Sequence, residues 1–228
     1  MIPVIVCGAL SVAAVLVRQL FFKSGKLIGF GCKVLASFLF CIAGLFAVLE
    51  RGIDPQSALM LAAFFLAFAG DILLALAGFV DEKSNTFFSA VGGAAFLIGH
   101  IMYIVVFLSA EPLKPYLIPV FLILPAAYAV LVKKKLINPG KNTLPVMIYS
   151  AVLGAMATSV VNLAVSGNGG GIFALIAGIL FVLSDTALFI FNFGSERVKE
   201  LRGKWFVYCV FIPYYIAQGL FALCLVYL

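Results

Sequence analysis

The chain has 228 residues, of which 65% are hydrophobic and only 11% are charged, and its mean hydropathy is +1.23. A water-soluble domain is nearer half apolar and a quarter charged, so this composition excludes a soluble globular fold. In lipid, only helices and closed barrels satisfy their backbone groups. The apolar runs here extend over about twenty residues, which is the helical pattern, and the sequence therefore predicts an all-α membrane protein.

Eight apolar segments follow one another along the chain and predict a single bundle of eight transmembrane helices over residues 1–228. Charged residues and Pro or Gly clusters separate them. The predicted spans are 2–22, 28–49, 57–80, 87–109, 116–132, 144–166, 172–193 and 205–227. The connections are short, so consecutive spans are expected to be antiparallel neighbours.

The formal net charge of +6 does not indicate a nucleic-acid partner, because the basic residues lie in short stretches between the apolar runs. Such positive charges set the orientation of a membrane protein. The five cysteines form no CxxC pair, so we expect neither disulfides nor zinc binding from them. Residues 1–22 are expected to remain in the mature chain, since no basic stretch precedes the first apolar run.

Alternating directions for the eight spans divide the loops between two sides of the membrane. One side receives thirteen of the fifteen basic residues, and the other receives only Arg51 and Lys114. Cytoplasmic loops carry the excess of lysine and arginine, so we expect the first side to be cytoplasmic and both termini to lie outside. The short loops and the lack of any sorting tail favour a bacterial inner (cytoplasmic) membrane as the location.

Two acidic residues lie well inside apolar runs: Asp71 in the third span and Asp185 in the seventh. A carboxylate near the bilayer centre costs about 2.5–3.5 kcal/mol on insertion scales, and such a residue normally faces the bundle interior at a functional site. Both spans run in the same direction, and each aspartate lies roughly 12–14 Å from the cytoplasmic end at 1.5 Å per residue. The alternative is a pair of acids that only joins helices through hydrogen bonds.

The local sequences around the two aspartates are similar. Gly70–Leu74 reads GDILL and Ser184–Leu188 reads SDTAL, and the aspartates are 114 residues apart, which is half of the chain. A parallel 4+4 duplication of four helices would explain both the similarity and the shared depth. The site would then lie at the interface of the two halves.

Further polar side chains inside the spans are expected to accompany the two acids. His100 and Tyr103 are three residues apart and therefore share one face of the fourth span. We expect His100 to orient or tune the acids, although an interhelical hydrogen bond is the alternative for it. Lys33, about five residues into the second span, either extends its ammonium to the membrane surface or contacts a phosphate. The expected substrate-binding residues are Lys33, Tyr103, Tyr149, Asn192, Tyr215 and Gln218.

Metal and serine hydrolase mechanisms have little support in the sequence. A single histidine with two aspartates and no thiolate pair within a span is a poor set of zinc ligands. Neither the HExxH nor the GxSxG motif occurs. We therefore expect no metal and no other cofactor.

Four motifs around these residues occur in a fixed order. They are Gly70-Asp71-x-Leu73-Leu74, Phe96-Leu97-x-Gly99-His100-x-x-Tyr103, Ser184-Asp185 and Tyr214-Tyr215-x-Ala217-Gln218. Together with the eight spans, this order resembles the YhhN family of membrane proteins, which includes the lysoplasmalogenases. One difference is that Val34 follows Lys33, where the family often has Lys-Pro.

The resemblance implies a hydrolase that acts on a lysophospholipid among the membrane lipids. Because both aspartates lie nearer the cytoplasmic ends of their spans, we expect the active site to face the cytoplasmic leaflet. It would cleave the vinyl ether bond of a lysoplasmalogen to a fatty aldehyde and glycerophospho-ethanolamine or -choline. Vinyl ethers yield to acid and not to nucleophiles, so two buried carboxyl groups suit this reaction as one acid and one anion. Asp71, Asp185 and His100 are the expected catalytic residues.

Two other functions compete with hydrolysis. A proton-coupled transporter would use the same acids to bind and release protons, and Gly92, Gly93 and Pro213 are weak signs of the broken helices found in transporters. A non-catalytic lysolipid-binding protein would hold the lipid without releasing aldehyde. An aldehyde assay on purified protein separates these classes.

Overall fold

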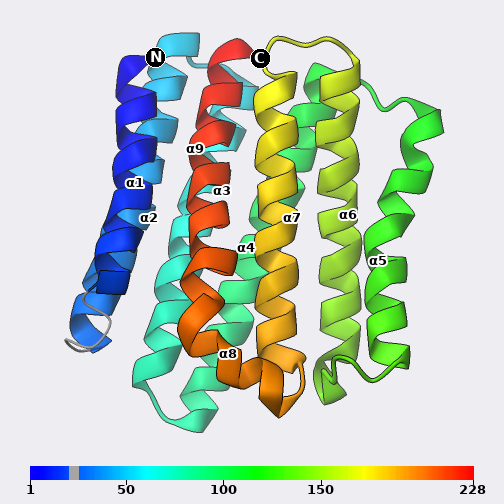
Figure 1. The fold of residues 1–228 in the computed structure, drawn as a ribbon. Helices are drawn as coiled ribbons and strands as arrows, with labels where there is room; N and C mark the ends of the chain where they lie inside the picture. The colour runs from blue at the N-terminus through cyan, green and yellow to red at the C-terminus, as the bar shows by residue number, and fades with distance from the viewer. Residues whose placement is uncertain (21–25) are drawn as a thin grey trace.

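The computed structural model describes residues 1–20 and 26–228, without the side chains at 19, 20, 26, 197, 199 and 202–204. Over these residues the structure is helical, with an isolated antiparallel bridge between Ile137 and Gly194. Figure 1 shows the helices side by side along a common axis. The predicted all-α class is confirmed.

Eight long helices traverse the bundle within the described ranges. In chain order they are α1 (Ile2–Leu20), α2 (Lys26–Arg51), α3 (Pro55–Leu76), α4 (Glu82–Ala110), α5 (Ile118–Lys133), α6 (Thr143–Val165), α7 (Gly171–Phe193) and α9 (Ile212–Tyr227). Three 3₁₀ turns lie at helix ends: Ala77–Phe79, Pro115–Leu117 and Gly140–Asn142. Most of these limits agree with the predicted spans to within a few residues, because the apolar runs end near the helix ends. α4 begins five residues before its predicted span, and the predicted last span, 205–227, comprises the end of a polar helix, a π-helical turn and α9.

Seven helical segments of the described chain are long and apolar enough to cross a membrane, and they include every long helix except α1. The apolar part of α1, Ile2–Arg18, is shorter, yet α1 packs along both α2 and α9. The two termini lie at the same end of the bundle in Figure 1. An even number of traverses requires this arrangement.

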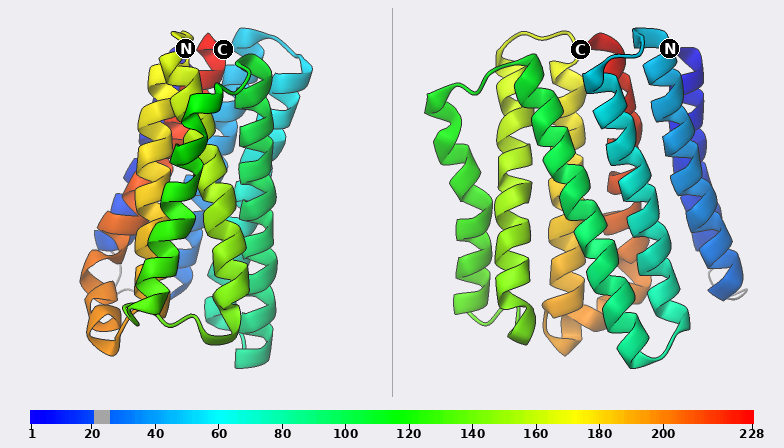
Figure 2. Two further views of the ribbon diagram at one scale, coloured as in Figure 1. Left: turned by 90° about the vertical axis from the view of Figure 1, so that its right-hand side faces the viewer. Right: turned by 180° about the vertical axis from the view of Figure 1, so that it is seen from behind.

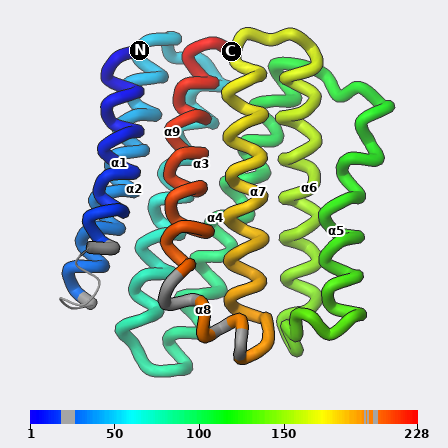
Figure 3. Tube along the Cα trace, viewed as in Figure 1, coloured from blue at the N-terminus to red at the C-terminus, as the bar shows by residue number. Residues whose placement is uncertain are grey.

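The helices form two layers. Helices α1, α9 and α7 form one layer, and α2, α3 and α4 form the other, as the opposed views of Figures 1 and 2 show. α9 contacts α1, α2 and α7, and α6 contacts α4, α5 and α7. The trace in Figure 3 places α1 and α5 at opposite edges of the bundle. α9, the last helix, therefore lies at the centre of the bundle and packs against both the first two helices and α7.

A short polar helix, α8 (Glu196–Phe206), precedes the last span. We expected only a connection here, because the charged residues gave no apolar signal. The segment instead forms a helix that begins after Ser195, carries Glu196 in its first turn, and lies at the end opposite the termini (Figure 1). An acidic residue there interacts favourably with the positive end of the helix dipole. A π-helical turn, Val207–Phe211, joins α8 to α9.

The start of α3 is fixed by a side-chain cap. The carboxylate of Asp54 accepts a hydrogen bond from the backbone N–H of Ser57 at 2.7 Å, and Pro55 occupies the first turn. This backbone hydrogen bond lowers the pKa of Asp54 below its usual range. Capping sets the register of α3, and hence the depth of the polar residues along it.

Close approach of α3 and α4 depends on glycine. A Cβ atom on Gly70 would lie 2.7 Å from the ring of Phe96 and 3.1 Å from the carbonyl oxygen of Gly92. Small residues allow helices to approach closely in membranes. Gly70 immediately precedes Asp71, so this contact fixes the α3 backbone next to the aspartate.

Candidate functional site

Both intramembrane aspartates line one cavity. The cavity has a volume of about 710 Å³ and extends from the two acids to the end of the bundle opposite the termini, where Asn85, Asn192 and Phe206 line it. Asp71 is only 4% exposed and Asp185 only 6%. Neither side chain is turned toward lipid, and the predicted juxtaposition of two buried acids around one space is present in the structure.

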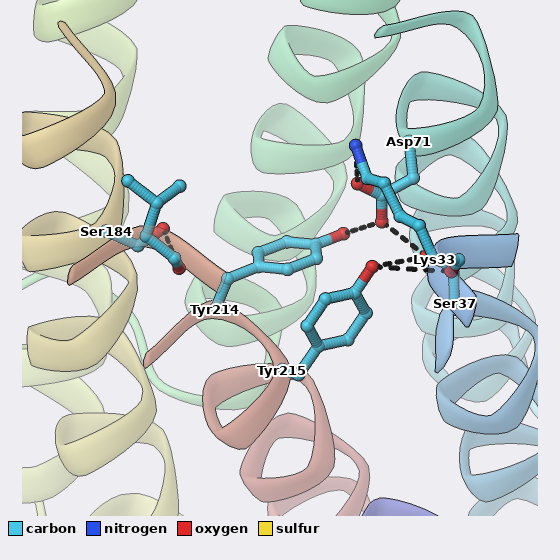
Figure 4. Close-up of polar contacts among 7 residues, drawn as sticks. Lys33, Ser37, Asp71, Ser184, Tyr214 and Tyr215 are labelled. Atoms are coloured by element: carbon cyan, nitrogen blue, oxygen red, sulfur yellow. Dashed lines mark hydrogen bonds and ion pairs between the residues drawn. The ribbon is translucent and has the colours of Figure 1, made fainter. Parts of the chain in front are cut away.

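Asp71 is held by three donors. Its Oδ1 atom lies 3.1 Å from the ammonium nitrogen of Lys33. Its Oδ2 atom accepts hydrogen bonds from Ser37 Oγ and Tyr214 OH, each at 2.8 Å. Figure 4 shows these groups converging on the carboxylate from α2 and α9. The negative charge of Asp71 is thus compensated by a cation and two hydroxyl groups.

Tyr215 extends this network behind the carboxylate. Its hydroxyl is 2.9 Å from Ser37 Oγ and 3.5 Å from the carbonyl oxygen of Lys33. Tyr214 and Tyr215 are consecutive, and both reach α2 or α3 from the first turn of α9, directly after the π-helical turn (Figure 4). Ser184 Oγ donates to the carbonyl oxygen of Val210 in that turn at 2.9 Å. The π-helical turn therefore has a side-chain partner in α7.

Asp185 has a different environment. Its Oδ2 atom accepts a hydrogen bond from Tyr149 OH at 2.8 Å. The Nε2 atom of His100 lies 3.8 Å from the same oxygen, and it has no hydrogen-bond partner among the described residues. The other ring nitrogen, Nδ1, is 2.7 Å from the carbonyl oxygen of Phe96. No lysine or arginine of the described chain forms an ion pair with Asp185, in contrast to Asp71.

The remaining residues predicted from sequence divide into two groups. Lys33, Tyr149 and Asn192 line the cavity. Tyr103 and Gln218 form a hydrogen bond of 2.8 Å with each other and are not among the lining residues. The Nε2 atom of Gln218 is buried without a partner in the described structure. Tyr103 and Gln218 lie in the core of the bundle and not at the cavity wall. Tyr215 is also buried in the core, but its hydroxyl contacts Ser37, a partner of Asp71.

Sequence reasoning did not select Ser37 or Arg18 as site residues, and it named Tyr214 only as a polar residue of the last motif. Ser37 is four residues after Lys33 and therefore shares its helix face, which is the signal that could have identified it. Tyr214 is adjacent to Tyr215, but consecutive helical residues normally point in different directions. Arg18 lines the cavity from the last turn of α1, and its position at the end of a span indicated only membrane orientation.

Some residues of the cavity wall in α3 and its following 3₁₀ turn correspond in spacing to residues of α7. Four pairs of lining residues are each 114 positions apart: Asp71 and Asp185, Leu74 and Leu188, Gly78 and Asn192, Phe79 and Phe193. The lining residues Phe96 and Val210 have the same separation, as do His100 and Tyr214, which approach the two acids. Each aspartate is thus approached from the second helix of its own half of the chain and from the last helix of the other half.

The donor set of the site does not resemble a metal centre. The described residues contain no group of three or more His, Cys, Asp or Glu side chains arranged to hold a metal ion. The arrangement is one of carboxyl, hydroxyl, ammonium and imidazole groups around an enclosed space. Such groups can donate and accept protons on a bound molecule.

Comparison with known proteins supports the resemblance seen in the sequence. The model of the YhhN family matches residues 29–225, which is most of the chain and includes all four motifs. No curated protein and no solved structure matches this chain.

Proposed function

This chain belongs to the YhhN family, and from that premise we propose that it hydrolyses the vinyl ether bond of lysoplasmalogens inside the membrane. The products would be a fatty aldehyde and glycerophospho-ethanolamine or -choline. One observation supports this proposal above all others: two buried carboxyl groups with unlike partners line the same cavity. Acid hydrolysis of a vinyl ether requires one carboxyl group that holds a proton and one that is charged.

The chemistry explains this requirement. Transfer of a proton to the β-carbon of the vinyl ether forms a C–H bond and leaves an oxocarbenium ion. Water then adds to the cationic carbon and loses a proton, and the resulting hemiacetal collapses to aldehyde and alcohol. Glycosidases pass through a similar oxocarbenium-like state and also use two carboxyl groups.

We assign the acid to Asp185. The Nδ1 atom of His100 faces a carbonyl oxygen, so it carries the hydrogen. A charged imidazole would leave a buried N–H at Nε2 without a partner, which is costly, so the ring is neutral and its Nε2 lone pair faces Asp185. Within the described residues no lysine or arginine forms an ion pair with Asp185, and its neighbour His100 is neutral. Asp185 therefore avoids the cost of a buried unpaired charge by holding its proton.

Asp71 then serves as the anion. Its ion pair with Lys33 and its two hydroxyl donors stabilise the charged form. The negative charge stabilises the oxocarbenium ion across the cavity. After donating its proton, Asp185 can take one from the attacking water, so that the proton balance closes within each turnover. His100 and Tyr149 position Asp185 for both steps.

The depth of the acids suits a single-chain lipid. Asp71 and Asp185 each precede a phenylalanine at the cavity mouth, Phe79 and Phe193, by eight residues. This is about 12 Å of helix at 1.5 Å per residue. A lysolipid with its phosphate near the mouth would place its vinyl ether several ångströms deeper, toward the acids. The basic loops favour the cytoplasmic side for this mouth and a bacterial inner membrane as the location.

We also infer that the two halves arose by duplication of four helices. The constant separation of 114 residues along the cavity walls supports it. So do the helix contacts, because α2 packs on α9 as α6 packs on α4, which exchanges the second and last helices of the two halves. The substrate would then bind on the interface between the halves, as in transporters built from repeats.

The proposed activity is tested with purified protein and a lysoplasmalogen in detergent or vesicles. Aldehyde should appear with the wild type and fall below 1% of that rate in Asp71→Asn and Asp185→Asn, which keep the shape of the side chain. The ester lysolipid serves as the specificity control. Lysolipid binding without aldehyde would instead support a binding protein, and lipid or proton flux without aldehyde would support a transporter.

A further inference from the structure

The short polar helix α8 carries an exposed apolar stripe. Leu201, Trp205 and Tyr208 are 48%, 52% and 49% exposed. They follow one another at intervals of four and three residues, so they share one face of α8 and of the π-helical turn that continues it. The rings of Trp205 and Tyr208 lie 6.3 Å apart, so the stripe is continuous across the junction.

Other residues attach α8 to the bundle. The main partners of α8 are α7 and the π-helical turn. Val198 packs against the end of α7, where a Cβ atom on Gly194 would lie 3.0 Å from its Cγ1 atom, and Val207 and Val210 of the turn are buried. The stripe of Leu201, Trp205 and Tyr208 therefore presents about half of its surface to the surroundings of the bundle.

The composition of α8 indicates what these surroundings are. Its sequence has a net charge of +2, because four basic residues oppose two acidic ones: Arg197, Lys199, Arg202 and Lys204 against Glu196 and Glu200. An ion pair formed within the helix leaves this net charge unchanged. A polar helix with an apolar stripe and an excess of basic residues is typical of helices that lie in the headgroup region of a membrane. Tryptophan and tyrosine are enriched at the same depth.

We propose that α8 is an interfacial helix that binds anionic phospholipids of the leaflet beside the cavity mouth. The stripe of Leu201, Trp205 and Tyr208 inserts among the lipids, and the net positive charge of the helix attracts negatively charged headgroups. α8 lies at the end of the bundle opposite the termini (Figure 1). Phe206 and Val210 line the cavity, so lipids bound along α8 lie next to its entrance. This inference goes beyond the proposed hydrolysis and does not depend on it.

The chain contains its own reporter for this contact. Trp205 is the only tryptophan, so the intrinsic fluorescence of the full-length protein reports the surroundings of the stripe. The protein is reconstituted into vesicles that contain phosphatidylcholine and phosphatidylglycerol in equal amounts. Bromine atoms, which quench tryptophan on contact, are attached near the headgroup end of the acyl chains of one lipid or of the other.

We expect the brominated phosphatidylglycerol to quench Trp205 about threefold more strongly than the brominated phosphatidylcholine, because anionic headgroups gather at a positively charged helix. Acrylamide, a quencher dissolved in the water on both sides of the membrane, should have little effect. These two measurements on the wild type establish first that lipid covers the stripe, and second which lipid does so.

Variants of α8 test the origin of the preference. Lys199→Gln/Lys204→Gln reduces the net charge of the helix to zero, so the two brominated lipids should quench Trp205 nearly equally. Glu200→Gln raises the net charge and should strengthen the preference for phosphatidylglycerol. Lys83→Gln is the matched control: it removes an exposed lysine from the first turn of α4 at the same end of the bundle, and the preference should remain.

Four outcomes would overturn the proposal. Strong quenching by acrylamide without quenching by either brominated lipid would place the stripe in water. Equal quenching by the two lipids would show contact without selection. Lipid quenching that falls as the protein-to-lipid ratio rises would mean that a second copy of the chain covers the stripe. These three are measured on the wild type and need no variant to fold. The fourth is an unchanged preference in Lys199→Gln/Lys204→Gln.

Discussion

The two aspartates that line the cavity have unlike partners. Asp71 faces a lysine and two hydroxyl groups, whereas Asp185 faces a tyrosine hydroxyl and a histidine nitrogen that lacks a hydrogen-bond partner in the described structure. A buried ion needs a counter-charge and hydrogen bonds, and a neutral acid does not. In the proposed reaction, this difference in partners gives the two aspartates different roles.

The ion pair at Asp71 leads to a prediction about stability. Lys33→Met removes the cation and leaves a buried carboxylate without compensation, which typically costs about 3–5 kcal/mol. We expect a lower melting temperature in detergent and no aldehyde release. The double variant Lys33→Met/Asp71→Asn removes both charges, so it should recover most of the stability while remaining inactive. A Lys33→Met protein as stable as the wild type would contradict a charged Asp71.

The residue types explain which site residues were visible in the sequence. Charged groups within apolar runs are costly, so Asp71, Asp185 and Lys33 stood out, and spacing of three residues added His100. Ser37 was not selected, because a serine is common in membrane helices and carries no such cost. The pairing of Tyr103 with Gln218, away from the cavity, could not be inferred, because the sequence does not say which face of a helix meets the cavity.

At the scale of elements, the π-helical turn before α9 decides how two tyrosines reach the site. Ser184 Oγ donates to the carbonyl oxygen of Val210 within that turn. π-helical turns have wider hydrogen-bond spacing and are frequent at functional sites. A side chain of α7, adjacent in sequence to Asp185, thus supports the segment that places Tyr214 against Asp71. The hydrogen bond from Ser184 to Val210 thus links the helix that carries Asp185 to the segment that contacts Asp71.

Ser184→Ala tests the importance of this contact. It leaves the Val210 carbonyl oxygen without this hydrogen bond, which should reduce stability by roughly 1 kcal/mol and reduce the rate of aldehyde release several-fold, because Tyr214 loses support. Ser159→Ala is the matched control, since Ser159 Oγ donates only within its own helix, to the Met156 carbonyl oxygen at 2.8 Å. Equal activity in the two variants would argue against a role for the turn.

Hydropathy predicted the long helices well, because each apolar run must be helical in lipid and ends at charged or Gly and Pro residues. The same criterion could not find α8, which is polar, or the π-helical turn, which changes the helix register without changing hydropathy. Pro213 was the only local sign of irregular structure in the last span. Elements that deviate from an apolar helix were thus the ones that the sequence did not reveal.

For the whole molecule, the fold brings together residues from both halves of the chain. α9 lies between the first helices and α7, so Tyr214 can reach Asp71 across 143 residues of sequence. The order of the spans predicted that the halves would meet, but not which helices would touch. That α2 packs on α9 and α4 packs on α6 depends on side-chain complementarity, which a single sequence does not display.

The distribution of basic residues predicts how the bundle sits in a membrane. By the order of the spans, thirteen of the fifteen lysines and arginines belong to the end opposite the termini, so this end, with the cavity mouth, should face the cytoplasm. In bacterial cells, alkaline phosphatase fused after Leu228 should be active outside, and the same reporter placed after Lys134 should be inactive. The opposite pattern would place the mouth on the outer side.

The transfer of a proton from Asp185 to carbon is the central step of this account, and hydrolysis in D₂O tests it most directly. The aldehyde released by the wild type, trapped at once and analysed by mass spectrometry, should carry one deuterium at C2. Asp185→Asn, present at the same folded concentration, should release almost none. Aldehyde without deuterium at C2, or undiminished release by Asp185→Asn, would contradict the account.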